Sequence, residues 1–196
     1  MTVIDERTET TASTAPHDRI VDAAYELFAS RGVRDVSIDE IVVASGVAKA
    51  TLYRHFPSKD DLVLAFLAER EARWTFGVVD AGMRARAENP EERLLAIFDV
   101  FHDWFQRDDF EACSFVNVLL ELGPGHPAGQ ASITHLAAIR EVVRGFAGEA
   151  GLRDPEEFAL SWHILMKGSI VQAAEGDALA ARRAQDMART LIEQYR

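Results

Sequence analysis

A short stretch of the chain gathers side chains that can contact nucleic acid. From Gly46 to Leu62 the sequence is GVAKATLYRHFPSKDDL. Five of its polar or cationic residues lie close together in the sequence: Lys49, Thr51, Tyr53, Arg54 and His55. Lysine donates to guanine edges or phosphates, threonine contacts a thymine methyl group or a phosphate, and a tyrosine hydroxyl reaches a phosphate. The small side chain of Ala50 would let a helix lie close to the base edges, so the composition is that of a DNA-reading helix.

The neighbouring residues predict the elements that would present this helix. Two short helices, at about 37–44 and 48–55, are joined by the tripeptide SGV, and a small residue followed by a turn glycine is typical of a helix-turn-helix. Leu52 and Phe56 are four residues apart and should face inward with Val47. The side chains that should then face outward, as a recognition helix requires, are Lys49, Ala50, Tyr53 and Arg54.

The start of the following helix offers a second contact for DNA. Ser58 and Lys59 stand at its amino end. Free backbone N–H groups and the helix dipole favour an anion there, and the lysine adds a positive charge. We therefore expect a phosphate contact at this point.

Capping patterns mark where other helices begin. SIDE at Ser37–Glu40 and SKDD at Ser58–Asp61 are capping boxes. NPEE from Asn89 and DPEE from Asp154 each place a cap residue, a proline at the first helical position and acids in the first turn. Gly32 should end the first helix in the left-handed conformation. Apolar residues recur at helical spacing and no alternating run is long enough for a strand, so we predict an all-α fold of about nine helices.

The acidic residues lie mostly in the second part of the chain. The net charge is −11 and the isoelectric point is about 5.0, which argues against a general binder of polyanions. Residues 16–57 contain five Lys or Arg and six Asp or Glu, whereas residues 58–196 contain fifteen and twenty-three. The second part should repel DNA, so we expect weak non-specific binding and decisive specific contacts.

Other features bound the class of protein. The single cysteine, Cys113, cannot form an internal disulfide, and no stretch is apolar enough for a signal core or a membrane span. Residues 1–15 are polar and without period, as expected of a disordered tail. We predict a soluble cytoplasmic protein without a membrane partner.

The stretch from Gly46 to Leu62, with IVDAAYELFASRGVRDVSIDEIVVASGV before it, resembles the amino-terminal domain of the tetracycline-repressor (TetR) family of transcriptional regulators. The resemblance covers residues 17 to about 66. It implies that Lys49, Ala50, Thr51, Tyr53 and His55 lie against the major groove. It also implies phosphate contacts by Ser37, Tyr53 and Lys59. Arg54 is at a position where the family varies, so its role stays open.

The resemblance also implies a plan for the whole chain. We expect a tail at 1–15, a helix-turn-helix DNA-binding domain at 16–57 and a ligand-binding and dimerisation domain at 58–196. A homodimer would match a palindromic double-stranded operator. Its interface would use the last two helices, at about 155–174 and 177–195. The small residues that would allow close packing there are Gly168, Ser169, Ala173, Ala174, Ala180 and Ala184.

The second domain is rich in aromatic residues with a few polar groups among them, as in a small-molecule site. The candidate pocket residues are Trp74, Phe98, Phe101, His102, Phe105, Cys113, Phe115, Asn117, Trp162 and Met166. The ligand would be small and hydrophobic or amphipathic. A helix from Ser58 to about Arg86 should carry its effect to the DNA-binding domain, through pressure near Arg70, Trp74 or Val78. A solid aromatic core is the alternative for each of these residues.

Two other functions stay open at this point. The second domain could dock another protein rather than a small ligand. An enzyme could use Cys113 as nucleophile with His102 or His135 as base, although a cysteine in the apolar run CSFVNVLLEL is typically an inert core residue. The six histidines lack metal-binding spacing, so we predict neither a metal nor a cofactor. The resemblance implies repression, with activation as the alternative.

Overall fold

The computed structural model describes residues 15–196, so the tail predicted at 1–15 lies, apart from Ala15, outside the described residues. The helices are α1 (Pro16–Arg31), α2 (Ile38–Ser45), α3 (Lys49–His55), α4 (Lys59–Arg70), η1 (Glu71–Asp80), α5 (Ala81–Arg86), α6 (Pro90–Phe105), α7 (Ser114–Leu122), α8 (Pro127–Glu149), α9 (Pro155–Ala174) and α10 (Ala180–Tyr195). Because α4, η1 and α5 follow one another without a break, the described part of the chain forms nine helical rods. It contains no strand, and the all-α prediction is confirmed.

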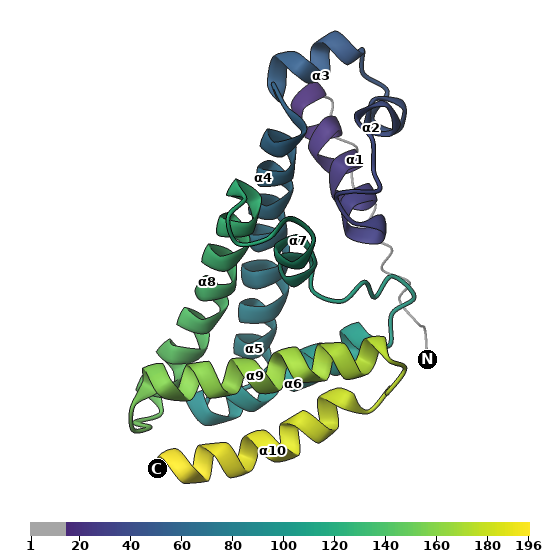
Figure 1. Cartoon of the computed structure of the whole chain (residues 1–196). Coiled ribbons are helices and arrows are strands. Elements are labelled where there is room, and N and C mark those ends of the chain that lie inside the picture. Colours follow the sequence, from purple (N-terminus) through teal and green to yellow (C-terminus); the bar gives the residue numbers. More distant parts are fainter. Residues whose placement is uncertain (1–14) are drawn as a thin grey trace.

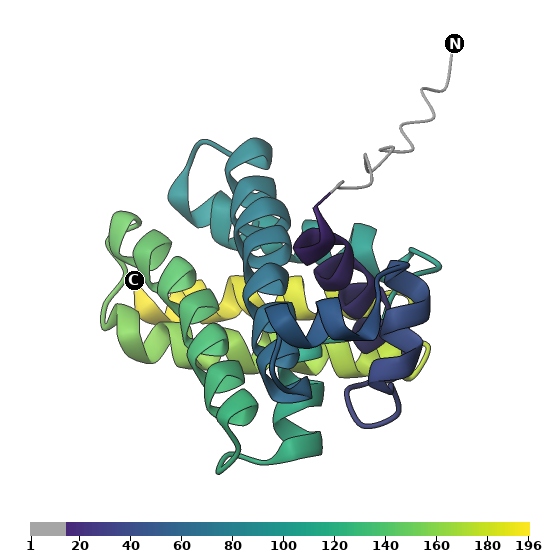
Figure 2. The ribbon, with the colours of Figure 1, turned by 90° about the horizontal axis from the view of Figure 1, so that it is seen from above.

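The helices form a three-helix unit at one end of the molecule and a helix pair at the other. Helices α1 to α3 lie at the top of Figure 1, and α4–η1–α5 descends from them beside α8. Helices α9 and α10 run antiparallel across the bottom. Figure 2, seen from above, shows this pair crossing beneath the upright helices. One continuous helix thus connects the two ends.

The predicted caps are present with one exception. Ser37 and Ser58 form complete capping boxes with Glu40 and Asp61, and the Asn89 side chain accepts a hydrogen bond from the Glu91 N–H. Asp154 precedes Pro155 as expected, but its side chain makes no capping hydrogen bond. Its backbone is left-handed, at φ 45° and ψ 61°, instead of the extended conformation that N-cap residues usually adopt. The predicted side-chain cap at this position is therefore wrong.

Of the two turn glycines, one differs from expectation. Gly46 adopts the left-handed helical conformation, at φ 62° and ψ 29°. Gly32 has positive φ, 82°, but ψ is 164°, so it is not in the left-handed helical region as predicted. This conformation turns the next two backbone N–H groups toward the Glu121 carboxylate. The Glu121 carboxylate is far from Gly32 in the sequence, so local sequence rules could not predict this conformation.

The middle of the long connecting helix is wound as a π-helix, from Glu71 to Asp80. Such segments are rare, and they occur frequently at functional sites. Thr75 and Val79 face the core, whereas Trp74 is half-buried and Val78 is exposed. The π-helical winding was not predicted, although the position and length of the long helix were.

Candidate nucleic-acid interface

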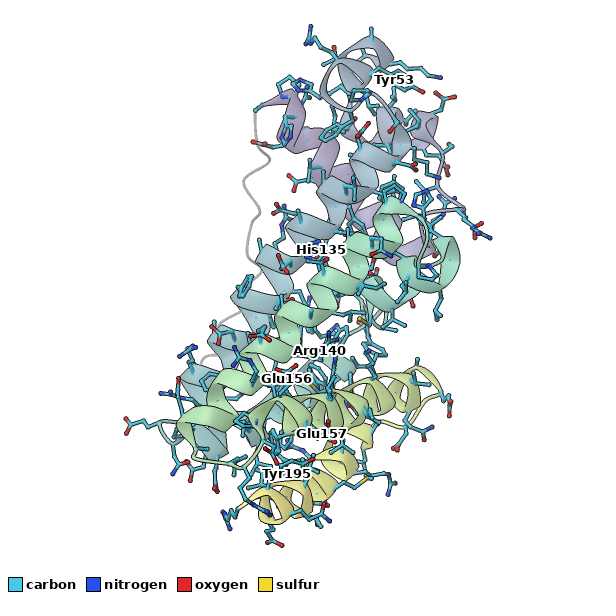
Figure 3. The ribbon with its side chains drawn as sticks, turned by 60° about the vertical axis from the view of Figure 1, so that its left-hand side comes forward. Tyr53, His135, Arg140, Glu156, Glu157 and Tyr195 are labelled. Carbon is cyan, nitrogen blue, oxygen red and sulfur yellow. The ribbon has the colours of Figure 1, made fainter. Side chains whose placement is uncertain are left out.

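The second helix of the helix-turn-helix is anchored by apolar residues and presents its polar face to solvent. Leu52, Phe56 and Val47 are buried as predicted. The Gly46 N–H closes the preceding helix by donating to the carbonyls of Val42 and Val43. The exposed residues of α3 are Lys49, Ala50, Tyr53, Arg54 and His55, while Thr51 is half-buried. Figure 3 shows Tyr53 at the end of the molecule remote from α10.

Lys49 is not a free cation. Its Nζ lies 2.6 Å from Oδ1 of Asp39, which belongs to α2. This hydrogen bond and the carboxylate charge raise the pKa of Lys49 above its usual range. A bound phosphate or base would have to compete with Asp39 for the ammonium group. Asp39 is a candidate functional residue that sequence reasoning missed, although its place in the first turn of α2 was visible.

The two serines at the predicted phosphate contacts are already engaged within the chain. The Ser37 hydroxyl donates to Glu40 at 2.8 Å, and the Ser58 hydroxyl donates to Asp61 at 2.6 Å. Backbone and side-chain hydrogen bonds from Ser37 and Arg31 lower the pKa of Glu40 to about 2. Lys59 is half-buried, with its Nζ 5.9 Å from the centre of the Phe28 ring.

Two contacts of acidic side chains connect the α7–α8 segment to the three-helix unit and to the start of α4. Glu121, at the end of α7, accepts hydrogen bonds from the backbone N–H groups of Val33 and Arg34, both at 3.1 Å. His126, just before α8, lies 3.3 Å from the Asp60 carboxylate. The α7–α8 segment therefore contacts both the α1–α2 turn and the start of α4.

A cavity of about 240 Å³, here called the junction cavity, lies where the three-helix unit meets the other helices. It is lined by Tyr25, Glu26, Ala29, Arg70, Arg73, Trp74, Val78, Trp104, Arg107, Asp109 and Glu111. All three positions at which ligand pressure was expected, Arg70, Trp74 and Val78, are among them. The lining combines α1, the long connecting helix, the end of α6 and the loop after it.

The ten candidate pocket residues are divided among several environments. Trp74 lines the junction cavity. Cys113 and Asn117 line a second, apolar cavity of about 80 Å³, together with Lys167 and Ile170. His102 and Phe105 are half-buried on α6. The remaining five are buried in the core, where they pack against other side chains: Phe98, Phe101, Phe115, Trp162 and Met166.

Three observations concern a reactive cysteine, a metal site and a membrane span. Burial raises the pKa of the Cys113 thiol, which disfavours the reactive thiolate. Among residues 15–196, no group of three or more His, Cys, Asp or Glu side chains is arranged to hold a metal ion. In the same range, no helix is long and apolar enough to cross a membrane.

Helix α9 is apolar on two faces. Phe158, Trp162 and Met166 are buried in the chain's own core. On the opposite face Leu160, Ile164, Gly168 and Val171 are exposed, and Ile164 retains 71% of its accessible surface. On the neighbouring helix Met187 is 60% exposed. Of the small residues expected at a dimer interface, Ser169, Ala180 and Ala184 are instead buried within the monomer.

Comparison with known proteins gives this arrangement a family context. Residues 20–66 match the model described as bacterial regulatory proteins, tetR family. The transcriptional activator FasR of Mycolicibacterium smegmatis is 38% identical over 86 residues, which are 44% of this chain and 38% of that protein. A Mycobacterium tuberculosis protein that carries the name of a mycofactocin biosynthesis transcriptional regulator, MftR, is 46% identical over 157 residues, 78% of this chain and 75% of that protein.

A solved structure extends the similarity to the whole described fold. The crystal structure of a TetR-family transcriptional regulator from Streptomyces coelicolor has a TM-score of 0.83 and 25% identity. The match covers 92% of this chain and 95% of that one. The likeness therefore includes the helices beyond residue 66.

Proposed function

This chain belongs to the TetR family of bacterial transcriptional regulators, and we propose that it binds a palindromic operator as a homodimer and leaves it when a small ligand binds. We assign residues 16–57 to the DNA-binding domain and residues 58–196 to ligand binding and dimerisation. The observation that carries the DNA-binding proposal is the exposed polar face of α3 above its buried apolar anchors.

In this proposal α3 enters the major groove. Lys49, Ala50, Thr51, Tyr53 and His55 contact the bases and the adjacent backbone, and Arg54 extends the same face. Ser37 and Lys59 contribute phosphate contacts at the edges. Because Asp39 holds Lys49 in the free protein, DNA binding exchanges one ion pair for another. Random DNA then gains little from this lysine, which favours specific over non-specific binding.

The dimer uses the exposed apolar face of α9 and the neighbouring surface of α10. Leu160, Ile164 and Val171 would remain in water in a single chain. A second copy related by a two-fold axis would cover this face with the same residues. The two α3 helices would then fit half-sites roughly 34–36 Å apart, or a multiple of that distance.

Ligand release works through the long helix α4–η1–α5 and the contact at Glu121. A ligand in the junction cavity would touch α1 and η1 together, because both line it. It would change the angle between the three-helix unit and the rest of the chain, and thereby the separation of the two α3 helices. Coupling of this kind is typically worth about 1–3 kcal/mol.

The test is selection of bound DNA from a random pool by the wild type, Lys49→Ala and Tyr53→Ala. We expect the wild type to recover a palindrome and both variants to lose it. Arg144→Ala, which removes an exposed cation from α8, is the matched control and should recover the same palindrome. Recovery of unrelated sequences by the wild type would reject the proposal. Transcription from the recovered operator, with and without the protein, distinguishes repression from activation.

A further inference from the structure

We infer that the junction cavity binds a small aromatic carboxylate through the guanidinium of Arg70. The inference deepens the proposed function and rests on it for its regulatory meaning, because it gives the effector a place and a chemical class. Four features carry it: an unpaired buried arginine, neighbouring arginines that are already neutralised, an aromatic wall, and a limited volume.

Arg70 is a charged side chain that forms no ion pair in the described chain, although the charges of Asp109 and Glu111 are near enough to interact with it. It is only 8% exposed, and its Nη1 donates to the hydroxyl of Tyr25 at 2.8 Å. Its guanidinium also lies 5.7 Å from the Tyr25 ring centre and 5.1 Å from that of Trp74. No carboxylate within residues 15–196 is at ion-pair distance from it. A guanidinium has five N–H donors, and a buried one is stabilised when a carboxylate accepts from two of them.

The other two arginines of the cavity are already neutralised. Arg73 forms ion pairs with Asp22 and Glu69, both at 2.5 Å. Arg107 donates twice to Asp109, at 2.6 Å for each bond. An anion entering the cavity would have to displace these carboxylates to reach either of them. Arg70 is therefore the cation that is open to a ligand.

A cationic ligand fits the cavity less well. Glu26 and Glu111 have no ion pair in the described chain, but Glu26 is exposed at the rim. The Tyr25 ring, which could attract a cation, already has the guanidinium groups of Arg70 and Arg73 over it, the latter 4.9 Å from the ring centre. The buried charge at the centre of the site is thus positive. Burial raises the pKa of Glu111, against the opposing effect of the Arg70 charge.

The aromatic wall and the volume define the rest of the ligand. Trp74 and Trp104 have ring centres 4.3 Å apart, and Ala29 and Val78 add apolar surface. The volume, about 240 Å³, is below the roughly 300–1,000 Å³ of sites for drug-sized molecules. One or two aromatic rings with a carboxylate match both the wall and the space.

The experiment measures binding to the full-length protein without DNA, by calorimetry and by tryptophan fluorescence. The probes are benzoate, phenylacetate and naphthoate, each with its matched carboxamide and its matched amine. The variants are Arg70→Gln and Glu111→Gln. The matched control is Arg84→Gln, which removes another arginine stacked on an aromatic ring, that of Phe146, outside the cavity lining.

We expect at least one carboxylate to bind at least tenfold more tightly than its carboxamide and its amine. Arg70→Gln should abolish this preference, whereas Arg84→Gln should keep it. Glu111→Gln should strengthen carboxylate binding severalfold, and this readout survives if Arg70→Gln fails to fold. Equal affinity for carboxylate and carboxamide, preference for the amine, or binding of none of the probes would overturn the inference. Because no DNA is present, a failed operator selection would reject the proposed function and leave this result standing.

Discussion

Replacing Glu121 with alanine tests whether α7 positions the DNA-binding unit. The carboxylate accepts two backbone hydrogen bonds, from Val33 and Arg34, across a large separation in sequence. Hydrogen bonds to charged groups contribute about 1.5–3 kcal/mol each. Only the Val33 bond is partly buried, while the Arg34 bond is exposed. Discounting the second for solvent gives a loss of about 2 kcal/mol in the free energy of unfolding.

This loss should be visible in two assays. For a chain of this size, about 2 kcal/mol corresponds to a fall in melting temperature of about 4–8 °C. If the contact also orders the α1–α2 turn for DNA, operator affinity should fall by up to about 30-fold. Glu121→Gln keeps a neutral acceptor oxygen, so it should recover part of both losses.

A double-mutant cycle with Gly32 supplies the control. A Cβ at Gly32 would lie 2.5 Å from Oε1 of Glu121, so Gly32→Ala should displace the carboxylate. The two substitutions should then be less than additive, because each removes the same contact. If Glu121→Ala leaves both the melting temperature and operator affinity unchanged, the reasoning is refuted.

Three further changes have expected outcomes. Asp39→Asn frees Lys49 and removes a negative charge near the recognition helix. Affinity for random DNA should therefore rise severalfold in a filter-binding assay. No change in this affinity would mean that the Lys49–Asp39 ion pair does not restrain the lysine. Ile164→Asp places a charge in the proposed dimer face, and sedimentation should show monomers with lost operator binding, whereas persistence of the wild-type sedimentation profile would exclude this face. Burial, with Lys167 nearby, lowers the pKa of His163 to about 3. The unfolded chain therefore binds the proton first, and the free energy of unfolding should fall as pH drops from about 6.5 toward 3, by up to about 1.4 kcal/mol per pH unit. His163→Gln should remove that slope in urea titrations.

The helix-turn-helix was predictable because its determinants are local. The Ser37 capping box, the Gly46 turn and the spacing of Leu52 and Phe56 each act within a few residues. The same reasoning failed at Asp154, where the backbone adopts a left-handed conformation that the side-chain type does not reveal.

The junction cavity could not be predicted from periodicity. Trp74 and Trp162 both appear as aromatic residues on helices, yet Trp74 lines a cavity and Trp162 fills the core. The difference depends on which distant segments meet at each side chain. Arg70 was placed on the correct helix, but its lack of an ion pair depends on how α1 and the α6–α7 loop fold around it. The outward apolar face of α9 was likewise hidden, since its inward face alone satisfied the helical pattern.

Because α9 is apolar on two faces, the stability of the fold should depend on the concentration of the protein. In the proposed dimer, a chain that separates from its partner would return Ile164 and its neighbours to water. Mass action then links folding to abundance, so dilution should lower the melting temperature even with nothing else altered. In a cell that makes few copies, the protein should therefore be less stable than in a cell that makes many.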